Sequence, residues 1–270
     1  MTDQQSSGFQ VGVGVPDHYE LYVAPLMKPF VAALVDAVVR PGQRVLDVAC
    51  GTGFATRVAA NAIGSGGYLA AIDINPAMIS KARQQPLPGD IDWRVASALE
   101  LPFEDESFDA IICQQGLQFL PSPADGLAEM QRVLRPGGTL GATVWAPLHL
   151  SPYLAAQAEL MVEYAGVDKR VLAQAIPPEG KAAVEQWLAS SRWGTTQIDT
   201  LVFDVSFPEL RHYIPNHLRA LPWSAGFFTQ PIETQAAAVD AMIAKLEHFI
   251  ELDGTAHIPT ASLLLTATRS

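Results

Sequence analysis

The sequence has few cysteines and few basic residues, and each shortage excludes a class of protein. Cys50 and Cys113 are the only cysteines among 270 residues. Two cysteines in apolar runs do not make a disulfide framework and are typical of small buried side chains in a reducing compartment. Lys and Arg number 17 against 28 Asp and Glu, a formal charge of −11. That sign is wrong for binding by phosphate neutralisation, so nucleic acid is not an expected partner.

Long apolar runs are also missing. Asp36 interrupts the run from 31 to 39, and no stretch approaches the roughly 20 residues that a membrane helix needs. The first ten residues, MTDQQSSGFQ, lack the basic and apolar regions of a signal peptide and are expected to be a flexible lead-in. No constellation of metal ligands is present, so no metal is predicted. We expect a cytosolic protein without a membrane span.

Apolar residues make up 49% of the chain, which is enough for a large folded core. Strand-like and helical patterns alternate five times over about 100 residues. The expected strands are 44–49, 68–74, 91–95, 108–113 and 139–145, and the expected helices are 29–39, 54–63, 76–83 and 122–134. This alternation predicts an α/β fold with a Rossmann-like, doubly wound and mostly parallel sheet.

After residue 145 the pattern becomes mainly helical. Helices are expected near 152–164, 180–190, 208–221 and 232–252, strands near 197–207 and 261–268, and an aromatic loop at 222–228. We interpret residues 1–270 as a single domain with a helical cap inserted after strand five. The core would comprise about 40–146, 195–207 and 256–269, and the cap and insertions about 147–194 and 208–255.

The most informative segment is residues 45–53, VLDVACGTG, where a strand feeds a glycine turn and then a helix. Ligands bind at the carboxyl ends of parallel strands. Asp47 would repel a pyrophosphate and favour a cation, and Gly51 and Gly53 would let a ligand approach the backbone. Thr56 stands where a dinucleotide fingerprint has its third glycine. An ammonium or sulfonium ligand is therefore favoured over a dinucleotide.

Asp73 ends the second strand, where a carboxylate can accept hydrogen bonds from both hydroxyls of a ribose. Ile74 follows as an apolar shelf. Ser97, Ala98 and Leu99, after the third strand, are placed to border an adenine edge. Together these residues describe a site for a nucleoside joined to a cationic amino acid.

In this order, VLDVACGTG, IDINPAMI, LPFEDESFDAIICQQGLQF and LRPGG resemble the class I S-adenosylmethionine-dependent methyltransferases, especially the ubiquinone/menaquinone-biosynthesis branch. The likeness covers about residues 19–145. It implies a seven-stranded sheet with an antiparallel last strand. It also implies S-adenosyl-L-methionine as cofactor and S-adenosyl-L-homocysteine as product.

The resemblance also implies roles for individual residues. Residues around the methionine part would be Asp47, Ala49, Gly51 and Gly53, with Cys50 in the same turn and Gln114 at the methionine end. Those around the nucleoside would be Asp73, Ile74, Met78, Ser97, Ala98 and Leu99, with Ala98 offering its N–H to adenine. Tyr19 or Tyr22 would cover the methionine.

Two positions depart from the family pattern. Ser97 replaces the usual aspartate, which predicts a weaker or water-mediated adenine contact. Gln118 and Phe119 stand where many relatives have a histidine, which leaves no base at the expected place.

His149, just past the fifth strand, is the candidate catalytic base, with a packing role as the competing interpretation. His18 and Tyr22 are alternatives. The candidate substrate-binding residues are Gln118, Trp145, Trp223 and Phe227. The aromatic loop either lines an apolar acceptor pocket or plugs the cap, and the sequence favours neither.

These observations predict an enzyme that transfers a methyl group by in-line displacement, mainly through positioning, to a small, partly apolar acceptor with an O, N or C nucleophile. The protein would be a monomer or a homodimer. The leading alternative is a cofactor-binding cyclase or pericyclase of the same fold that has lost methyl transfer. A nicotinamide-dependent oxidoreductase and a non-catalytic binding protein are further alternatives, the first disfavoured by Asp47.

Overall fold

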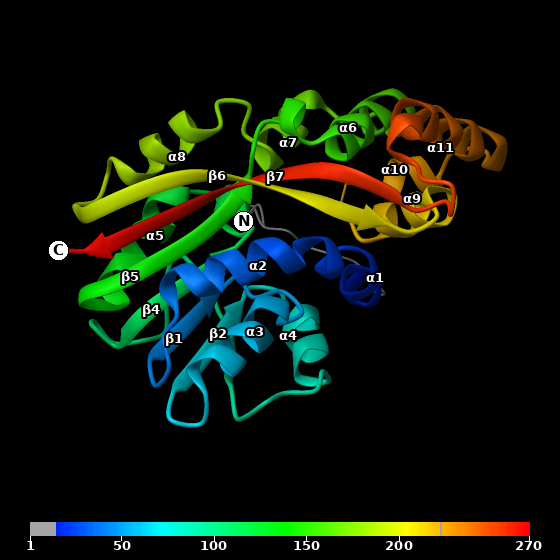
Figure 1. Ribbon diagram of the computed structural model, residues 1–270. Helices are drawn as coiled ribbons and strands as arrows, with labels where there is room; N and C mark the ends of the chain where they lie inside the picture. Colours follow the sequence, from blue (N-terminus) through cyan, green and yellow to red (C-terminus); the bar gives the residue numbers. More distant parts are fainter. Residues whose placement is uncertain (1–14, 222) are drawn as a thin grey trace, which may run out of the picture.

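One seven-stranded sheet organises the computed structural model, which describes residues 15–221 and 223–270. The strand order is β3-β2-β1-β4-β5-β7-β6 (Figure 1). Strands β1 to β5 pair in parallel, whereas β7 is antiparallel to both β5 and β6. The strands are β1 Arg44–Val48, β2 Tyr68–Asp73, β3 Asp92–Val95, β4 Phe108–Gln114, β5 Leu134–Trp145, β6 Trp193–Phe207 and β7 Ala256–Arg269. The predicted α/β fold class, with its antiparallel last strand, is confirmed; the expected N-terminal lead-in lies outside the described residues.

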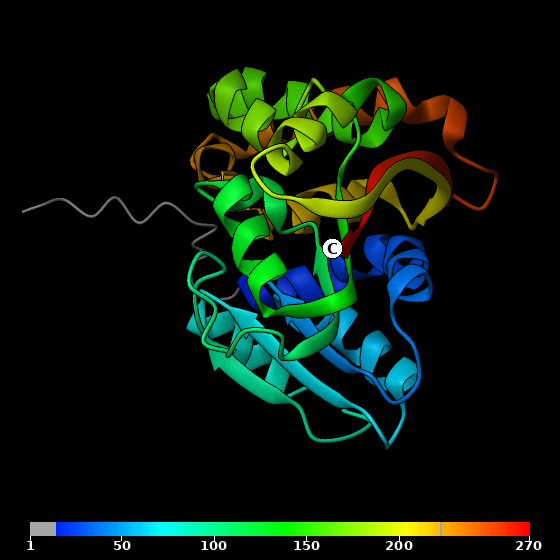
Figure 2. The same ribbon diagram turned by 90° about the vertical axis from the view of Figure 1, so that its left-hand side faces the viewer.

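Helices cover both faces of this sheet. Helices α2 Ala24–Val38, α3 Phe54–Ile63 and α4 Pro76–Arg83 pack on one face, and α5 Pro123–Val133 and α8 Lys181–Leu188 pack on the other. Further helices gather at one end of the molecule (Figures 1 and 2). They are α6 Pro152–Ala165, α7 Lys169–Ala175, α9 Leu210–Arg219, α10 Ala225–Phe228 and α11 Ile232–Leu246, with 3₁₀ turns at Leu117–Phe119, Leu148–Leu150 and Glu247–Phe249. One of these helices, α9, packs against α1 Val15–Tyr22.

The first helices differ from the prediction. Helix α2 begins at Ala24 rather than at Pro29, so Pro29 lies inside the helix, and α1 was not expected at all. Burial explains the earlier start, since Leu26, Met27 and Phe30 are all in the core. Packing of a continuous apolar face outweighs the local preference of proline for a first turn.

Strand boundaries also extend beyond the predicted ones. Strand β5 begins at Leu134, so the segment 135–138, expected as a turn, belongs to an irregular start of the strand where the pairing with β4 shifts register. Strands β6 and β7 both start earlier because they pair along almost their whole length, from Trp193 with Arg269 to Phe207 with Ala256. Long antiparallel pairing of this kind is a tertiary effect that local pattern does not reveal.

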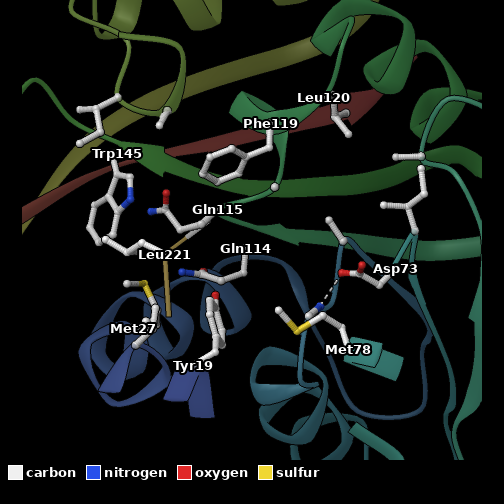
Figure 3. Close-up of a pocket in the computed structure, with 18 of the residues that line it drawn as sticks. Tyr19, Met27, Asp73, Met78, Gln114, Gln115, Phe119, Leu120, Trp145 and Leu221 are labelled. Carbon is white, nitrogen blue, oxygen red and sulfur yellow. Dashed lines mark hydrogen bonds between the residues drawn. The ribbon is translucent and has the colours of Figure 1, made fainter. Parts of the chain in front are cut away.

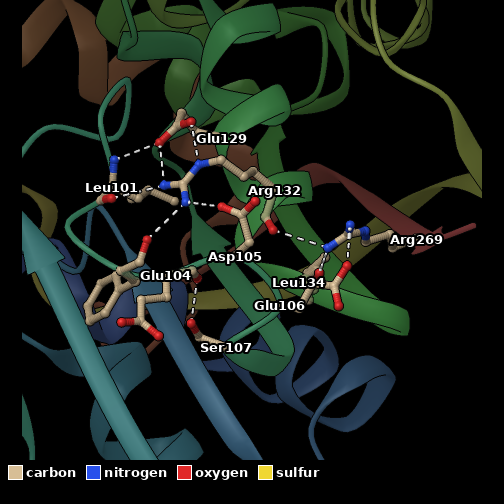
Figure 4. Close-up of polar contacts among 10 residues, drawn as sticks. Leu101, Glu104, Asp105, Glu106, Ser107, Glu129, Arg132, Leu134 and Arg269 are labelled. Atoms are coloured by element: carbon tan, nitrogen blue, oxygen red, sulfur yellow. Dashed lines mark hydrogen bonds and ion pairs between the residues drawn. The ribbon is translucent and has the colours of Figure 1, made fainter.

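Arg132, in the last turn of α5, fastens the loop that follows β3 (Figure 4). Its guanidinium donates to the carbonyls of Leu101 at 3.0 Å and Phe103 at 2.9 Å, and to Asp105 at 2.7 Å. Glu129 binds the same guanidinium at 2.8 and 2.9 Å and also accepts from the Leu101 N–H. This loop starts at the expected adenine edge, so Arg132 stabilises one wall of the site from behind.

Within 15–221 and 223–270, no single helix is long and apolar enough to cross a membrane. Helices α1 and α2 meet that criterion only as a pair, and they are bent by 63° at their junction.

Candidate active site

A pocket lies at the carboxyl ends of β1, β2 and β4 and extends beneath the helices α6, α7 and α9 (Figure 3). Its cavity volume is about 190 Å³. One part of the wall comes from the sheet and its loops: Ala49, Gly51, Ile72, Asp73, Ile74, Met78, Ala96, Ser97, Ala98, Leu99, Gln114, Gln115, Gly116, Phe119, Leu120 and Pro121. The other part comes from helices and the ends of later segments: Tyr19, Val23, Leu26, Met27, Trp145, Leu154, Gln157, Ala175, Ile176, His217, Leu221 and Trp223.

Most of the residues singled out from the sequence line this pocket. They are Tyr19, Ala49, Gly51, Asp73, Ile74, Met78, Ser97, Ala98, Leu99, Gln114, Trp145 and Trp223. Those that do not line it are His18, Tyr22, Asp47, Cys50, Gly53, Gln118, His149 and Phe227. In Figure 3, Asp73 and Met78 lie at one end of the view and Trp145 and Leu221 at the other, so the pocket has two distinct ends.

Asp73 is held by backbone amides at the end of β2. Its Oδ2 accepts from the N–H of Gly51 at 2.9 Å and its Oδ1 from the N–H of Asn75 at 2.8 Å. Burial raises the pKa of Asp73, and these two hydrogen bonds act against that rise. A carboxylate has about four acceptor sites, so both oxygens keep capacity for further donors in the pocket.

The two glycines of the turn serve different purposes. Gly51 has a φ of +55°, and among residues 15–221 and 223–270 an added Cβ there would meet only Tyr19, 4.0 Å away. Gly53, with a φ of +78°, would place a Cβ 2.6 Å from Trp93. The missing side chain of Gly53 makes room for Trp93, and Gly53 does not line the pocket.

Asp47 lies beneath the turn and is fully buried. Its Oδ2 accepts from the Thr56 hydroxyl at 2.6 Å, while Oδ1 has no hydrogen-bond partner in the described part of the chain. Burial raises the pKa of Asp47 to about 7; the Thr56 hydrogen bond lowers it and the charge of Asp73 adds to the rise. Asp47 does not line the pocket, so any influence on a ligand passes through the turn or through its charge.

The expected adenine edge is formed as a short loop after β3. The Oγ of Ser97 accepts from the N–H of Leu99 at 3.1 Å, so this side chain is engaged locally. Among the described residues, none accepts a hydrogen bond from the N–H of Ala98. Ile74 is 52% exposed and Met78 is buried, and both line the same end.

Glutamines surround the middle of the pocket. Gln114 accepts from the Thr143 hydroxyl at 2.9 Å, and its buried Nε2 has no partner among the described residues. Gln118, expected to bind substrate, instead donates to Gln115 at 2.7 Å, and Gln115 donates to Ser262 at 2.7 Å. Gln115 rather than Gln118 reaches the pocket.

Helix α1 places Tyr19 in the pocket but directs Tyr22 elsewhere. The hydroxyl of Tyr22 lies 3.3 Å from Nε2 of His212. The backbone carbonyl of Tyr22 accepts a hydrogen bond from the hydroxyl of Tyr213. His18 stacks on Tyr22, with ring centroids 6.1 Å apart. Of the alternatives left open by the sequence, Tyr19 is the tyrosine that lines the site.

The pocket-facing histidine is His217 rather than His149. His149 is exposed in the 3₁₀ turn after β5, which moves it away from the cavity. His217 lies on α9, is 3% exposed and lines the pocket. Burial lowers the pKa of His217 to about 3, so its ring is neutral at physiological pH.

The aromatic loop divides between the two roles that the sequence left open. Trp223 lines the pocket and stacks on Phe119, with ring centroids 6.3 Å apart. Phe227 is fully buried in the core beside Phe228 and does not line the pocket. The cysteines behave as expected, since both are free and buried, and burial raises the pKa of Cys113 to about 12.

Comparison with known proteins agrees with this arrangement. Residues 46–142 match the family described as "Methyltransferase domain". The ubiquinone/menaquinone biosynthesis C-methyltransferase UbiE of Ectopseudomonas mendocina is 42% identical over 106 residues, which cover 38% of this chain and 41% of that protein. Residues 46–142 therefore match a methyltransferase domain, within a seven-stranded sheet whose last strand is antiparallel. The family resemblance drawn from the sequence is thereby confirmed.

Solved structures show that the fold extends beyond the matched segment. Phosphoethanolamine N-methyltransferase 2 of Haemonchus contortus, in complex with S-adenosylhomocysteine, is 16% identical, with a TM-score of 0.59 over 94% of this chain and 56% of that one. The cyclase SpnF is 22% identical, with a TM-score of 0.50 over 89% of this chain and 80% of that one. These likenesses concern the fold. The chain spans less than half the length of the curated relatives that it matches first.

The sequence did not predict the polar residues that helices α6 and α9 contribute to the pocket. Gln157 on α6 and His217 on α9 both line the pocket. A signal was present, because each occupies a position whose helical neighbours, such as Leu154 and Ile214, are buried and apolar. A polar residue at a buried position of an amphipathic helix is a reason to expect a site.

Proposed function

We propose that the protein is an S-adenosylmethionine-dependent methyltransferase that acts on a small, partly apolar acceptor. The observation that carries the proposal is that one pocket joins the Asp73 and Gly51 end of the sheet to a compartment lined by Trp145, Leu221 and other apolar side chains. A nucleoside-bearing cofactor and an apolar acceptor would therefore meet in a single cavity. The match of residues 46–142 to the methyltransferase family supports the proposed methyl transfer.

The residues at the sheet end fit such a cofactor. Asp73 keeps acceptor capacity for ribose hydroxyls, and Gly51 leaves its backbone open to the pocket. The Nε2 of Gln114 is a buried donor without a partner among the described residues, which suits a carboxylate or carbonyl oxygen of a methionine part. Asp47, beneath the turn, favours positive charge nearby when ionised.

When bound, the cofactor supplies a methyl carbon on a positively charged sulfur, which the nucleophilic atom of the acceptor takes by in-line displacement. The residues of this chain contribute mainly alignment and exclusion of water. Tyr19 from α1 and Trp223 from the cap border the cavity from outside the sheet, so closing them over bound molecules would hold the two reactants together. The proton released by the acceptor would pass to water.

The acceptor would carry an O, N or C nucleophile. UbiE, the relative named above, is by its name a C-methyltransferase of quinone biosynthesis. A cytosolic location, an assembly of one or two subunits, and a single domain with the cap segments given above remain predictions from the sequence.

Calorimetric titration with S-adenosyl-L-homocysteine tests the cofactor, with NAD as the parallel ligand. We expect binding near micromolar, about −8 kcal/mol, and no response to NAD. Asp73→Asn should weaken binding at least about tenfold, because charged acceptors make the stronger hydrogen bonds, whereas the exposed Asp90→Asn should leave it unchanged. Failure of the wild-type protein to bind, or binding of NAD alone, would overturn the proposal.

The cyclase alternative is separated by product mass. SpnF has the same fold, and fold does not decide reaction. A product heavier than its precursor by one methylene supports methyl transfer, whereas an isomer of unchanged mass supports cyclisation.

A further inference from the structure

A buried polar cluster on the cap side of the pocket has no role in the proposed methyl transfer. It consists of His217 on α9 with Tyr153 and Gln157 on α6, which are 3%, 1% and 7% exposed. His217 and Gln157 line the pocket, while Tyr153 lies behind them in the core. The cluster therefore presents a polar group to an otherwise largely apolar compartment.

The contacts of the cluster assign a tautomer to His217 once the Gln157 amide is oriented with its nitrogen towards the ring. The Tyr153 hydroxyl lies 2.8 Å and the Gln157 Nε2 3.2 Å from the same ring atom, Nδ1. An amide nitrogen can only donate, so Nδ1 must accept. The ring is neutral, and its proton consequently sits on Nε2.

The Nε2–H group is left for a ligand. In the part of the chain that the structure describes, no hydrogen bond uses Nε2 of His217. Because His217 lines the pocket, this donor can be paired by a bound molecule. Around it the walls are apolar, with Leu154, Ile176 and Leu221 lining the same pocket.

We propose that the Nε2–H of His217 donates a hydrogen bond to an oxygen of the methyl acceptor, which is therefore an apolar molecule bearing a carbonyl, enolate or phenolic oxygen. This inference rests on the proposed function and names its acceptor class. A protonated amine has no lone pair for the histidine. A neutral amine would give to the histidine the lone pair that has to attack the methyl group.

The same bond assists an oxygen- or carbon-centred nucleophile. When a phenol or enol loses its proton, negative charge rests on the oxygen that His217 contacts, and a fixed donor in an apolar site stabilises that charge. Because Nδ1 is already occupied by two donors, His217 is a substrate-positioning donor and not a proton acceptor.

Two substitutions separate the pocket-facing donor from the internal contacts. His217→Asn keeps an acceptor oxygen near the position of Nδ1, and so the contacts to Tyr153 and Gln157, but removes the Nε2–H. His217→Gln places an amide N–H near the position of Nε2 and loses the contacts of Nδ1 with Tyr153 and Gln157. A purely structural histidine would show the opposite ranking, with the Asn variant the more normal of the two.

The probe pair is 1-naphthol and naphthalene, titrated into protein saturated with S-adenosyl-L-homocysteine. We expect the wild-type protein and His217→Gln to prefer 1-naphthol by about tenfold, as for one hydrogen bond, and His217→Asn to bind both compounds alike. Equal binding of the two compounds by the wild-type protein, absence of binding of either, or a preference retained in His217→Asn would overturn the inference.

Cofactor titration of each variant keeps the two proposals apart. All three proteins should bind S-adenosyl-L-homocysteine with the same affinity, since His217 lies among the helices and not at the Asp73 end. Failure of the wild-type protein in this titration refutes the proposed function itself. Normal cofactor binding without discrimination between the naphthalene compounds refutes only the role of His217.

Discussion

The hydroxyl of Thr52 donates a hydrogen bond to Oε2 of Glu20 at 2.6 Å. Thr52 lies between the two glycines of the turn, and Glu20 follows Tyr19 on α1. Arg57 of α3 binds the other carboxylate oxygen of Glu20. Helix α1, which brings Tyr19 to the pocket, is thus fastened to the glycine turn that follows β1.

Glu20→Gln should weaken binding of S-adenosyl-L-homocysteine by about fivefold, because a partly buried ion pair of about 1 kcal/mol no longer holds α1 on the turn. Asp17→Asn is the matched control on the same helix, since Asp17 pairs with Lys81 at 2.5 Å but is 64% exposed. Calorimetry should show almost no effect for it. Equal losses in the two variants would mean that the Glu20 contacts do not shape the site.

Asp47 should make the stability of the ligand-free protein depend on pH. Its pKa is about 7 in the folded protein, whereas an unfolded aspartate titrates near about pH 4. Between these values the folded state holds a proton that the unfolded chain has released. The contribution of protonated Asp47 to the free energy of unfolding is therefore fully present below about pH 4 and is lost as the pH rises through about 7.

Asp47→Asn cannot ionise and should melt at a higher temperature than the wild-type protein at pH 8, with the difference shrinking towards pH 5. Thermal unfolding across this range measures the effect, and the exposed Asp90→Asn serves as control. A difference that stays constant with pH would show that the carboxylate of Asp47 is not the titrating group.

Arg132→Leu should lower the free energy of unfolding by about 2 kcal/mol, because the carbonyls of Leu101 and Phe103 lose their donor. Urea denaturation measures this. Arg170 also engages a carboxylate, that of Asp168, but its side chain is 90% exposed. Arg170→Leu should leave the unfolding curve almost unchanged, and a loss as large as that of Arg132→Leu would argue against the loop contacts as the cause.

Trp223 and Phe227 should respond differently to truncation. Trp223→Ala should weaken 1-naphthol binding or raise the acceptor KM, with little change in cofactor affinity, because this ring lines the pocket. Phe227→Ala should instead cost about 3 to 5 kcal/mol of stability, since it empties a fully buried site. Both variants are tested by 1-naphthol titration and by thermal unfolding. If 1-naphthol binding and the acceptor KM are unchanged in Trp223→Ala, Trp223 does not contact the acceptor.

The Asp73 end of the pocket was predictable because its geometry is local. The strand, turn and helix around Gly51 are fixed within a few residues, and Asp73 follows from the next strand of a parallel sheet. The requirement for glycine at position 53 has a further cause that no short motif contains, a neighbour from another element, Trp93.

The end of the pocket beneath the helices was not predictable in the same way. Gln157 and His217 are 60 residues apart in sequence and meet only because α6 and α9 pack together. His149 is the candidate base in the sequence because it follows a strand end, but the turn after β5 leaves it exposed. Local rules place residues along an element, whereas the packing of distant helices decides which side chains share a cavity.

The strand order also constrains how the chain reaches this fold. Strand β6 is an edge strand whose sheet partner is β7, so on the ribosome residues 193–207 emerge without a neighbour to pair with until 256–269 have been made. Helices α9, α10 and α11 are synthesised in this interval. Pairings between such distant segments raise the contact order and slow folding. The part of the molecule after residue 193 should therefore fold late. Before β7 is made, the unpaired β6 should be the stretch most prone to aggregate during synthesis.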